Sequence, residues 1–270
     1  MLPPFVFLPG LFETAHIWQP TIRRMGLDPA RTLCLDLPGH RPGDTAEDVR
    51  LGLADGTWIE DAAARIGDWQ GGEPAVFVGH STGAMMSIPL VRRHPDLFHS
   101  MALVAGLTSG RRARGLDPLG AAITAPVLGP PVFRAAFRLW LSSPFFFRHG
   151  FLVAAARSPG KESFPELPLM RAQLAACDLM ALRTMATWVL GTDVAADLDH
   201  IDLPILALIG RADPVVAPRH QIALVKRAPN AQAQILDCGH LVFLEAPEAV
   251  ARALRGWPGS FRHASGAESA

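Results

Sequence analysis

The nine residues AVFVGHSTG, at positions 75–83, join a short apolar run to a segment of helical periodicity that continues to His94. The apolar run predicts a buried β-strand and the following segment an α-helix, so Ser81 lies at the turn between them. Such a turn projects a serine hydroxyl beyond the sheet, and Gly79 and Gly83 allow other chain segments to approach closely. The pattern predicts that Ser81 is a nucleophile; a purely structural turn is the alternative.

Similar apolar runs recur along the chain and alternate with longer segments of helical period. The runs are continuous rather than alternating, as in parallel strands that are buried on both faces. This order predicts an α/β fold with a mostly parallel sheet of about six strands flanked by helices. The expected strands are 4–8, 32–36, 75–78, 101–105, 205–209 and 232–236, and the expected helices are 57–69, 82–94, 217–227 and 241–257.

Residues 107–199 interrupt this alternation. The segment holds clusters of Gly and Pro and two helical stretches, 132–141 and 169–190, but no expected strand. It predicts a helical cap inserted between two strands, with residues 1–106 and 200–258 forming the core. The polar residues 259–270 are predicted to form a flexible tail.

The composition is typical of a folded globular protein. Of 270 residues, 49% are hydrophobic and 19% are charged, which is far from the composition of disordered chains. Lys and Arg together number 25, as do Asp and Glu, so the chain lacks the strong positive charge of nucleic-acid-binding proteins. We therefore expect a small-molecule substrate and no nucleic-acid partner.

We expect no signal peptide and no membrane-spanning segment in this sequence. The first ten residues, MLPPFVFLPG, lack the basic region and the cleavage site of a signal peptide. The longest membrane-like run, 118–133, is shorter than the roughly 20 residues that a spanning helix needs, so we expect no stable membrane insertion. Cys34, Cys177 and Cys238 show no Cys-x-x-Cys spacing, and we expect free thiols and a cytoplasmic location.

A serine hydroxyl is a weak nucleophile and needs a base. Of the ten histidines, His240 is the best placed because it directly follows the last expected strand. The carboxyl ends of parallel strands share one edge of the sheet, so His240 is expected on the same edge as Ser81. His80, beside Ser81, is expected to support the turn rather than to accept the proton.

The base in turn needs a carboxylate that fixes its tautomer and stabilises its charged form. Asp213 follows the expected strand 205–209, and one helix and one strand fit between it and His240. Asp237, at the same strand end as His240, and Asp36, at the end of an earlier strand, are the alternatives. The pattern favours Asp213.

Acyl transfer also needs backbone N–H groups that stabilise the negative charge on the carbonyl oxygen. Thr82, the residue after Ser81, supplies one of them at the positive end of the expected helix. A second is expected from the loop 8–12, LPGLF, where Gly10 permits a close turn. We assign this oxyanion-hole donor to Leu11, with Phe12 as the alternative.

In the order Ser81, Asp213, His240, and in the motifs around them, the chain resembles the α/β-hydrolase superfamily, in particular cap-containing serine hydrolases of the esterase and lactonase kind. The resemblance covers nearly the whole chain. It implies the α/β-hydrolase fold, a Ser-His-Asp triad, and a cap over the active site that selects the substrate. The motifs that carry it are GHSTG at 79–83, LPGLF at 8–12 with Trp18, DLPGH at 36–40, RHP at 93–95, GH at 239–240 and EAP at 245–247.

Two features depart from the pattern of the superfamily. Pro9 and Gly10 stand where many members have His-Gly, and the first strand begins almost at Met1, without the two-strand hairpin that precedes it in the family. The sheet is therefore expected to lack those strands. Its edge would be covered by a second copy of the chain, in a homodimer, or by solvent-facing polar groups.

Aromatic residues are concentrated in the expected cap. Phe133, Phe137 and Trp140 have a helical spacing that places them on one face, which either packs on the core or walls an apolar pocket. We name these three, with Phe12 and Met85, as candidate substrate-binding residues. Met85, just past Ser81, would extend the pocket lining or belong to the core.

The cap is also rich in arginine. Residues 111–157 contain seven arginines and one acid, Asp117. These arginines form a solvated face, bind an anionic group of the substrate, or contact an acidic lipid surface.

The expected function is that of a serine hydrolase with no cofactor and no metal, which cleaves a small or medium apolar carboxylic ester, lactone or thioester through an acyl-enzyme. Acyl transfer and carbon–carbon bond hydrolysis by the same triad are alternatives. A ligand-binding receptor that keeps the fold without catalysis is an alternative from another class.

Overall fold

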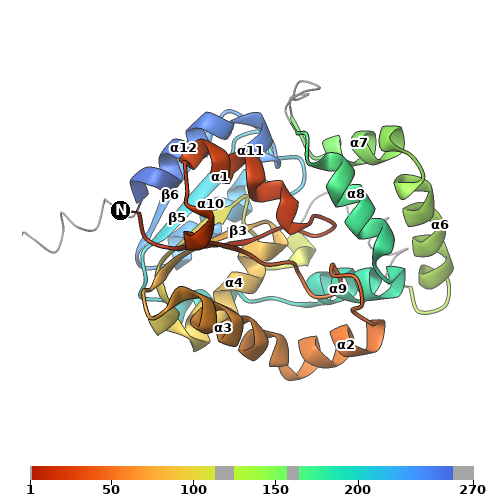
Figure 1. Ribbon diagram of the computed structural model, residues 1–270, viewed down its shortest axis with the longest axis horizontal. Helices are drawn as coiled ribbons and strands as arrows, with labels where there is room; N and C mark the ends of the chain where they lie inside the picture. Colours follow the sequence, from red (N-terminus) through yellow and green to blue (C-terminus); the bar gives the residue numbers. More distant parts are fainter. Residues whose placement is uncertain (1, 113–124, 157–163, 258–270) are drawn as a thin grey trace, which may run out of the picture.

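The computed structural model describes residues 2–112, 125–156 and 164–257. Its centre is a six-stranded sheet in which all neighbouring strands are parallel, in the order β2-β1-β3-β4-β5-β6 (Figure 1). The predicted α/β fold and its six strands are confirmed, with ends that differ by one to three residues. The strands are β1 Phe5–Leu8, β2 Thr32–Cys34, β3 Ala75–His80, β4 Phe98–Val104, β5 Ile205–Gly210 and β6 Ala231–Leu236.

Helices cover both faces of the sheet, with α1 and α12 on one face and α3 and α4 on the other (Figure 1). In β1, Phe5 and Phe7 belong to the hydrophobic cluster of α1 and α12, whereas Val6 and Leu8 belong to the cluster of α3 and α4. This burial on both faces explains why the strands are continuous apolar runs. The helices of these layers are α1 Gln19–Met25, α2 Ala46–Asp55, α3 Thr57–Gln70, α4 Thr82–Arg93, α10 Pro218–Arg227, α11 Val242–Glu245 and α12 Pro247–Gly256, with short 3₁₀ helices at Ala15–Trp18, Pro29–Arg31, Pro95–Leu97, Gly110–Arg112 and Ala195–His200.

Two predicted helical stretches are divided, and other helices were not predicted. The stretch expected at 169–190 is two helices bent by 102°, and the Asp178 side chain accepts a hydrogen bond from the backbone N–H of Met180 at the start of the second. The stretch expected at 241–257 is divided at Ala246, which precedes Pro247 and so disfavours a continuous helix. Three helices were not predicted: α2, with Thr45 as its N-cap, and the helices at Gln19–Met25 and Pro144–Leu152. No single helix within the described ranges is long and apolar enough to cross a bilayer.

Helices α6 to α9 lie between β4 and β5 in the sequence and gather at one end of the sheet (Figure 1). We call them the helical insertion; its described part adds no strand to the sheet. Phe133 and Phe147 join the cluster of α1 and α12, whereas Met185 joins the cluster of α3 and α4, so the insertion is anchored to both halves of the core. The predicted tail, 259–270, lies outside the described residues. The bounds are α6 Gly129–Leu141, α7 Pro144–Leu152, α8 Leu167–Ala176 and α9 Leu179–Gly191.

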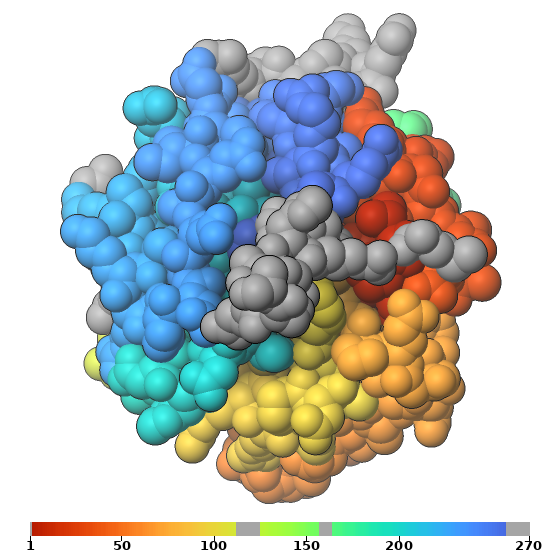
Figure 2. Space-filling view, turned by 90° about the vertical axis from the view of Figure 1, so that its left-hand side faces the viewer, coloured from red at the N-terminus to blue at the C-terminus, as the bar shows by residue number. Residues whose placement is uncertain are grey.

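The carboxyl ends of the strands point toward the helical insertion (Figure 1). Because the sheet is parallel, the loops that follow β1, β3, β5 and β6 all leave it at this edge. The opposite end of the molecule is formed by segments of the core, and the green segment that contains α6 and α7 is almost hidden there (Figure 2). Any site built by the strand-end loops is therefore enclosed between the sheet and the insertion.

The packing of α4 against β1 gives a test of the fold. A Cβ atom on Gly83 would lie 2.4 Å from the carbonyl oxygens of both Leu8 and Pro9, which are backbone atoms that cannot rotate away. We expect Gly83→Ala to lower the free energy of unfolding by about 2 kcal/mol or more, as overpacking does in a tight core. Urea titration at pH 7.5 measures the loss.

Gly191→Ala is the matched control, because nothing lies within 4 Å of the added methyl group at the end of α9. Its free energy of unfolding should be unchanged or slightly higher. Equal stability of the two variants would contradict this account of the helix–strand contact.

Candidate active site

Ser81 occupies a strained turn between β3 and α4. Its backbone has φ 50° and ψ −114°, a region that non-glycine residues rarely adopt, and its N–H donates to the carbonyl of Val104. A Cβ atom on Gly79 would lie 2.6 Å from the backbone nitrogen of Ala84, so the chain can turn this tightly only with glycine there. The strain is held by the surrounding contacts, as is common where a side chain must be presented.

Three polar side chains from separate strand-end loops meet at this turn. The Nε2 atom of His240 lies 3.0 Å from Ser81 Oγ, and its Nδ1 atom lies 2.8 Å from Asp213 Oδ2. A carboxylate can only accept, so Nδ1 carries the hydrogen and Nε2 is left as the acceptor for the serine hydroxyl. The structure thus brings together the serine, histidine and acid expected from the sequence.

The Asp213 carboxylate is fully buried and fully hydrogen-bonded. Its Oδ1 atom accepts from the backbone N–H groups of Val215 and Val216, both at 2.8 Å. Its Oδ2 atom accepts from His240 and, at 2.8 Å, from the Gln221 amide. These contacts fix the orientation of the acid, and neither Asp36 nor Asp237 is hydrogen-bonded to His240 among the contacts of the described residues.

Buried side chains hold the loop after β1 through its backbone N–H groups. Each bond joins the loop to a different residue, so the path of the loop is fixed along its length. The bonds run from Gly10 to Glu13 Oε2 (2.6 Å), from Phe12 to His40 Nε2 (2.9 Å) and from Ala15 to Asp36 Oδ1 (2.6 Å).

Two N–H groups beside Ser81 are left for an incoming oxygen. Leu11 and Thr82 both line the cavity described below, and no hydrogen bond in the described part of the chain uses either backbone N–H. The N–H of Phe12 already donates to His40 Nε2. Phe12 also has a positive φ of 60°, a backbone conformation that differs from that of ordinary loop residues. The geometry favours Leu11 over Phe12 as the second donor.

His40 is a buried, neutral histidine. Burial lowers its pKa to about 4, because the charged form would lose its hydration. Its Nδ1 atom donates to the carbonyl of Pro38 at 3.2 Å, which leaves Nε2 to accept from Phe12. The neutral form is therefore required for the loop contact.

Glu13 and His80 form a second buried pair next to the serine. His80 Nδ1 lies 2.8 Å from Glu13 Oε2, and its Nε2 atom donates to the backbone carbonyl of His240 at 3.1 Å. Burial opposes the charged form of His80, but the Glu13 carboxylate and the carbonyl of His240 outweigh it and raise the pKa of His80. Because Glu13 also accepts a hydrogen bond from the N–H of Gly10, the pair connects the loop after β1 with the serine turn and with the loop of His240.

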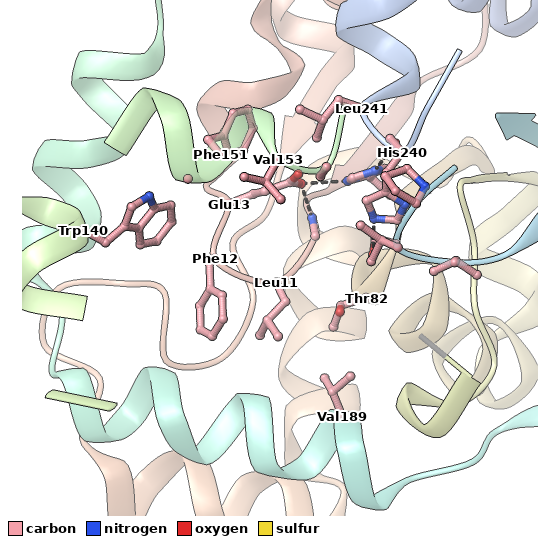
Figure 3. A pocket seen from close by; sticks show the side chains of 18 of the residues that line it. Leu11, Phe12, Glu13, Thr82, Trp140, Phe151, Val153, Val189, His240 and Leu241 are labelled. Atoms are coloured by element: carbon pink, nitrogen blue, oxygen red, sulfur yellow. Dashed lines mark hydrogen bonds and ion pairs between the residues drawn. The ribbon is translucent and has the colours of Figure 1, made fainter. Parts of the chain in front are cut away.

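An apolar cavity of about 470 Å³ opens beside Ser81, between the strand-end loops and the helical insertion. Phe12, Trp140, Phe151 and Val153 approach it from the side opposite His240 and Thr82 (Figure 3). The cavity lies within the size range of small-molecule sites. Its lining includes four of the five candidate substrate-binding residues: Phe12, Phe133, Phe137 and Trp140.

Met85 is the candidate that the structure places elsewhere. It is fully buried in the cluster of α3 and α4 and does not line the cavity. Met85 lies one turn after Ser81 on α4, and α4 turns that position into the protein interior. Of the two interpretations of this side chain, the core is the one that the structure supports.

Several residues at the site were not singled out from the sequence. Glu13 and Gln221 carry polar contacts, and Phe151 and Val189 add to the cavity wall. Glu13 could have been noticed in the sequence as an acidic residue in the loop that follows the first strand. Among the described residues, no group of three or more His, Cys, Asp or Glu side chains could hold a metal ion.

The low pKa of His40 predicts a specific acid sensitivity. In the unfolded chain His40 titrates near 6.5, so lowering the pH below this value favours unfolding, and the lost stability approaches about 3 kcal/mol near pH 4. We expect His40→Gln to show a shallower fall in the free energy of unfolding between pH 6.5 and 4.5. Urea titrations across this range measure it, with the exposed His200→Gln as the control; equal slopes in all three proteins would refute the assignment.

Comparison with known proteins identifies a family and several relatives. A model of the alpha/beta hydrolase family matches residues 5–253. A pimeloyl-[acyl-carrier protein] methyl ester esterase of Neisseria meningitidis is 26% identical over 82% of this chain, which spans 66% of that protein's length. A putative carbamate hydrolase of Serratia proteamaculans is 26% identical over 95% of this chain and 91% of its own.

The fold recurs in solved structures. A putative aryl esterase from Burkholderia cenocepacia superposes with a TM-score of 0.72 at 22% identity, over 94% of this chain and 89% of its own. Because the family model covers nearly the whole chain, from β1 to α12, the protein belongs to the α/β-hydrolase family.

Proposed function

We propose that the protein is a serine hydrolase that cleaves a small or medium apolar carboxylic ester, lactone or thioester through an acyl-enzyme. The observation that carries this proposal is the hydrogen-bonded series from Ser81 through His240 to Asp213 at the wall of an apolar cavity. The named relatives, an esterase and a putative carbamate hydrolase, support hydrolysis at a carbonyl centre.

In the first step, Ser81 Oγ attacks the substrate carbonyl while His240 Nε2 takes the hydroxyl proton. The imidazolium that forms is stabilised by Asp213, which already accepts the hydrogen of Nδ1. The N–H groups of Leu11 and Thr82 receive the oxygen as it becomes negatively charged. Because these donors are in place before the substrate arrives, little reorganisation is needed in the transition state.

In the second step, His240 returns the proton to the leaving alcohol or thiol, and the acyl group stays on Ser81. Water then attacks the acyl-enzyme, with His240 again acting as the base. The backbone N–H of His240 donates to Ala154 of the helical insertion at 3.0 Å, so the loop that carries the base is fixed against the wall of the cavity.

The lining of the cavity supports an uncharged substrate. Among the described lining residues, the side chains other than Glu13 and the histidines are apolar or carry a hydroxyl, and none is Lys or Arg. The Glu13 carboxylate is already engaged by Gly10 and His80. The described lining therefore offers no ion pair to a charged acyl group, which favours aliphatic or aromatic acyl groups of moderate size.

We also propose a reducing, cytoplasmic working environment. Cys34, Cys177 and Cys238 are all free of disulfides, as expected of thiols in such a compartment.

Removing the nucleophile is the direct test. Ser81→Ala should lower kcat on a water-soluble short-chain ester by roughly 10⁴-fold or more, because the acyl-enzyme cannot form. Wild type should be labelled by a fluorophosphonate probe, and Ser81→Ala should not. Ser142→Ala, at an exposed serine after α6, is the control that keeps both properties. Hydrolysis that survives Ser81→Ala would overturn the proposal, and a matched panel of esters, lactones and thioesters identifies the preferred bond.

The Glu13–His80 pair should be needed for activity as well as for stability. Glu13→Gln leaves a buried imidazolium without its counter-charge, so we expect a loss of about 3 kcal/mol in the free energy of unfolding. Since the pKa of His80 is raised, this difference is present below about pH 6.5 and shrinks as the pH rises through the raised pKa. We also expect kcat to fall more than KM changes, because Leu11 and His240 lose their relative positions.

Glu60→Gln is the matched control, because Glu60 forms an exposed pair with His94 at 3.0 Å. An exposed pair contributes at most about 1 kcal/mol, and this one lies away from the cavity. If Glu13→Gln matched Glu60→Gln in stability and in kcat, the positioning role of the buried pair would be wrong.

A further inference from the structure

Exposed apolar side chains are concentrated on the helical insertion. Ten large hydrophobic residues are exposed in the described part of the chain, and eight of them lie between positions 127 and 169. Single exposed apolar residues are common, but a concentration of this kind marks an interaction surface. The eight are Val127, Leu128, Val132, Leu139, Phe145, Phe146, Val153 and Leu169.

This apolar surface is continuous with the cavity. Val132 on α6 and Val153 after α7 both line the cavity, and they are 42% and 77% exposed. Val153 points into the space that also receives Trp140 and Phe151 (Figure 3). Two exposed apolar residues of this region therefore lie at the rim of the cavity that contains Ser81.

The same helices also carry positive charge. Residues 125–156 contain Arg134, Arg138 and Arg148 and no Asp or Glu. Arg134 and Arg138 are exposed, one turn apart on α6, and neither appears in an ion pair of the described residues. Elsewhere in those residues, eight arginines pair with carboxylates: Arg23, Arg24, Arg31, Arg41, Arg50, Arg92, Arg93 and Arg227.

These arginines do not serve the cavity itself. No arginine of the described residues lines it, so an anionic group of a substrate bound beside Ser81 would not meet Arg134 or Arg138 there. A second copy of the chain is also a poor partner, because a two-fold contact through α6 and α7 would bring two sets of arginines into one interface, and residues 125–156 contain no acid to offset them. The exposed residues of α6 and α7, which combine Phe, Leu and Val with arginine, match the composition of an interface with an anionic lipid layer.

We propose that the outer surface of α6 and α7 docks onto anionic lipid membranes, with Phe145 and Phe146 entering the interfacial region and Arg134 and Arg138 contacting lipid phosphates. Docking places the mouth of the cavity at the lipid surface, since Val132 and Val153 lie at its rim. Esters dissolved in the lipid layer can then reach Ser81 without crossing water. The docking stands on surface composition alone, whereas this substrate route rests on the proposed function.

Vesicle sedimentation with the full chain tests the docking. At low ionic strength, wild type should bind vesicles of phosphatidylglycerol and phosphatidylcholine at least tenfold more tightly than vesicles of phosphatidylcholine alone, and added salt should weaken the binding. Phe145→Ser with Phe146→Ser, and separately Arg134→Glu with Arg138→Glu, should each lower the binding at least tenfold. Leu51→Ser and Arg50→Glu, at exposed positions on α2, are the controls and should bind as wild type does.

Activity assays with two substrates distinguish an effect on docking from an effect on catalysis. None of the four substituted insertion residues lines the cavity, so hydrolysis of a water-soluble short-chain ester should be unchanged in both double variants. Hydrolysis of a long-chain ester carried in anionic vesicles should fall at least tenfold. If wild type cleaves neither ester, the proposed function fails while the sedimentation result still decides the docking.

Three outcomes would overturn the docking proposal. The first is wild-type binding that does not distinguish anionic from neutral vesicles. The second is equal binding by wild type and the two double variants. The third is a dimer, seen by light scattering, that the Phe145 and Phe146 substitutions convert to a monomer, which would assign the surface to a second copy of the chain.

Discussion

The close approach of α4 to the end of β1 is the contact on which the rest of the site depends. The space at Gly83 is filled by the carbonyl groups of Leu8 and Pro9, so α4 begins directly against the loop that follows β1. This approach places the first N–H of α4, on Thr82, beside the N–H of Leu11. It also forces the backbone of Ser81 into its strained conformation, which the bond from its N–H to Val104 holds. One packing contact thus sets the positions of the nucleophile and both expected donors.

Buried polar contacts then fix loops that could not hold their shape alone. Glu13 joins the loop after β1 to His80, and His80 joins the serine turn to the loop of His240. His40 accepts the N–H of Phe12, which fixes the peptide that follows Leu11 and leaves the N–H of Leu11 as the donor available in this loop. In a medium of low dielectric constant such bonds are strong when complete and costly when broken. The precision of the site therefore comes from charged and neutral histidines that do not react themselves.

The parallel sheet made the main elements of the site predictable. Because strand ends share one edge, Ser81, Asp213 and His240 could be assigned from their places after apolar runs, and the sheet order agrees with that assignment. The same reasoning identified the loop of Leu11. It could not choose between Leu11 and Phe12, because the choice depends on the positive φ of Phe12 and on a bond to His40.

Other features depend on tertiary contacts that the sequence pattern does not contain. His80, the partner of Glu13, lies 67 residues away in the sequence. Hydrophobic periodicity does not predict which residue of a loop will contact which residue at a strand end. Met85 is a flexible apolar side chain of the kind that lines pockets, but the face of α4 on which it lies packs into the protein core. The break between α8 and α9 could not be predicted, because the residues on both sides of it are apolar and the hydrophobic pattern continues across it. Helix α2 buries only Val49 and Leu53, which is too weak a periodic signal to stand out.

Charged and apolar residues occupy different places, so long-range attraction and the selection of the substrate at Ser81 depend on different residues. The chain has a net charge of zero, yet residues 125–156 carry three arginines and no acid. These charges lie outside a cavity lined almost wholly by apolar groups. Coulombic attraction extends over roughly a Debye length, about 10 Å in dilute salt, whereas apolar contact discriminates only at van der Waals distance. Arginines on α6 therefore act on how a substrate or a surface approaches, while the shape of the cavity decides which acyl group is cleaved.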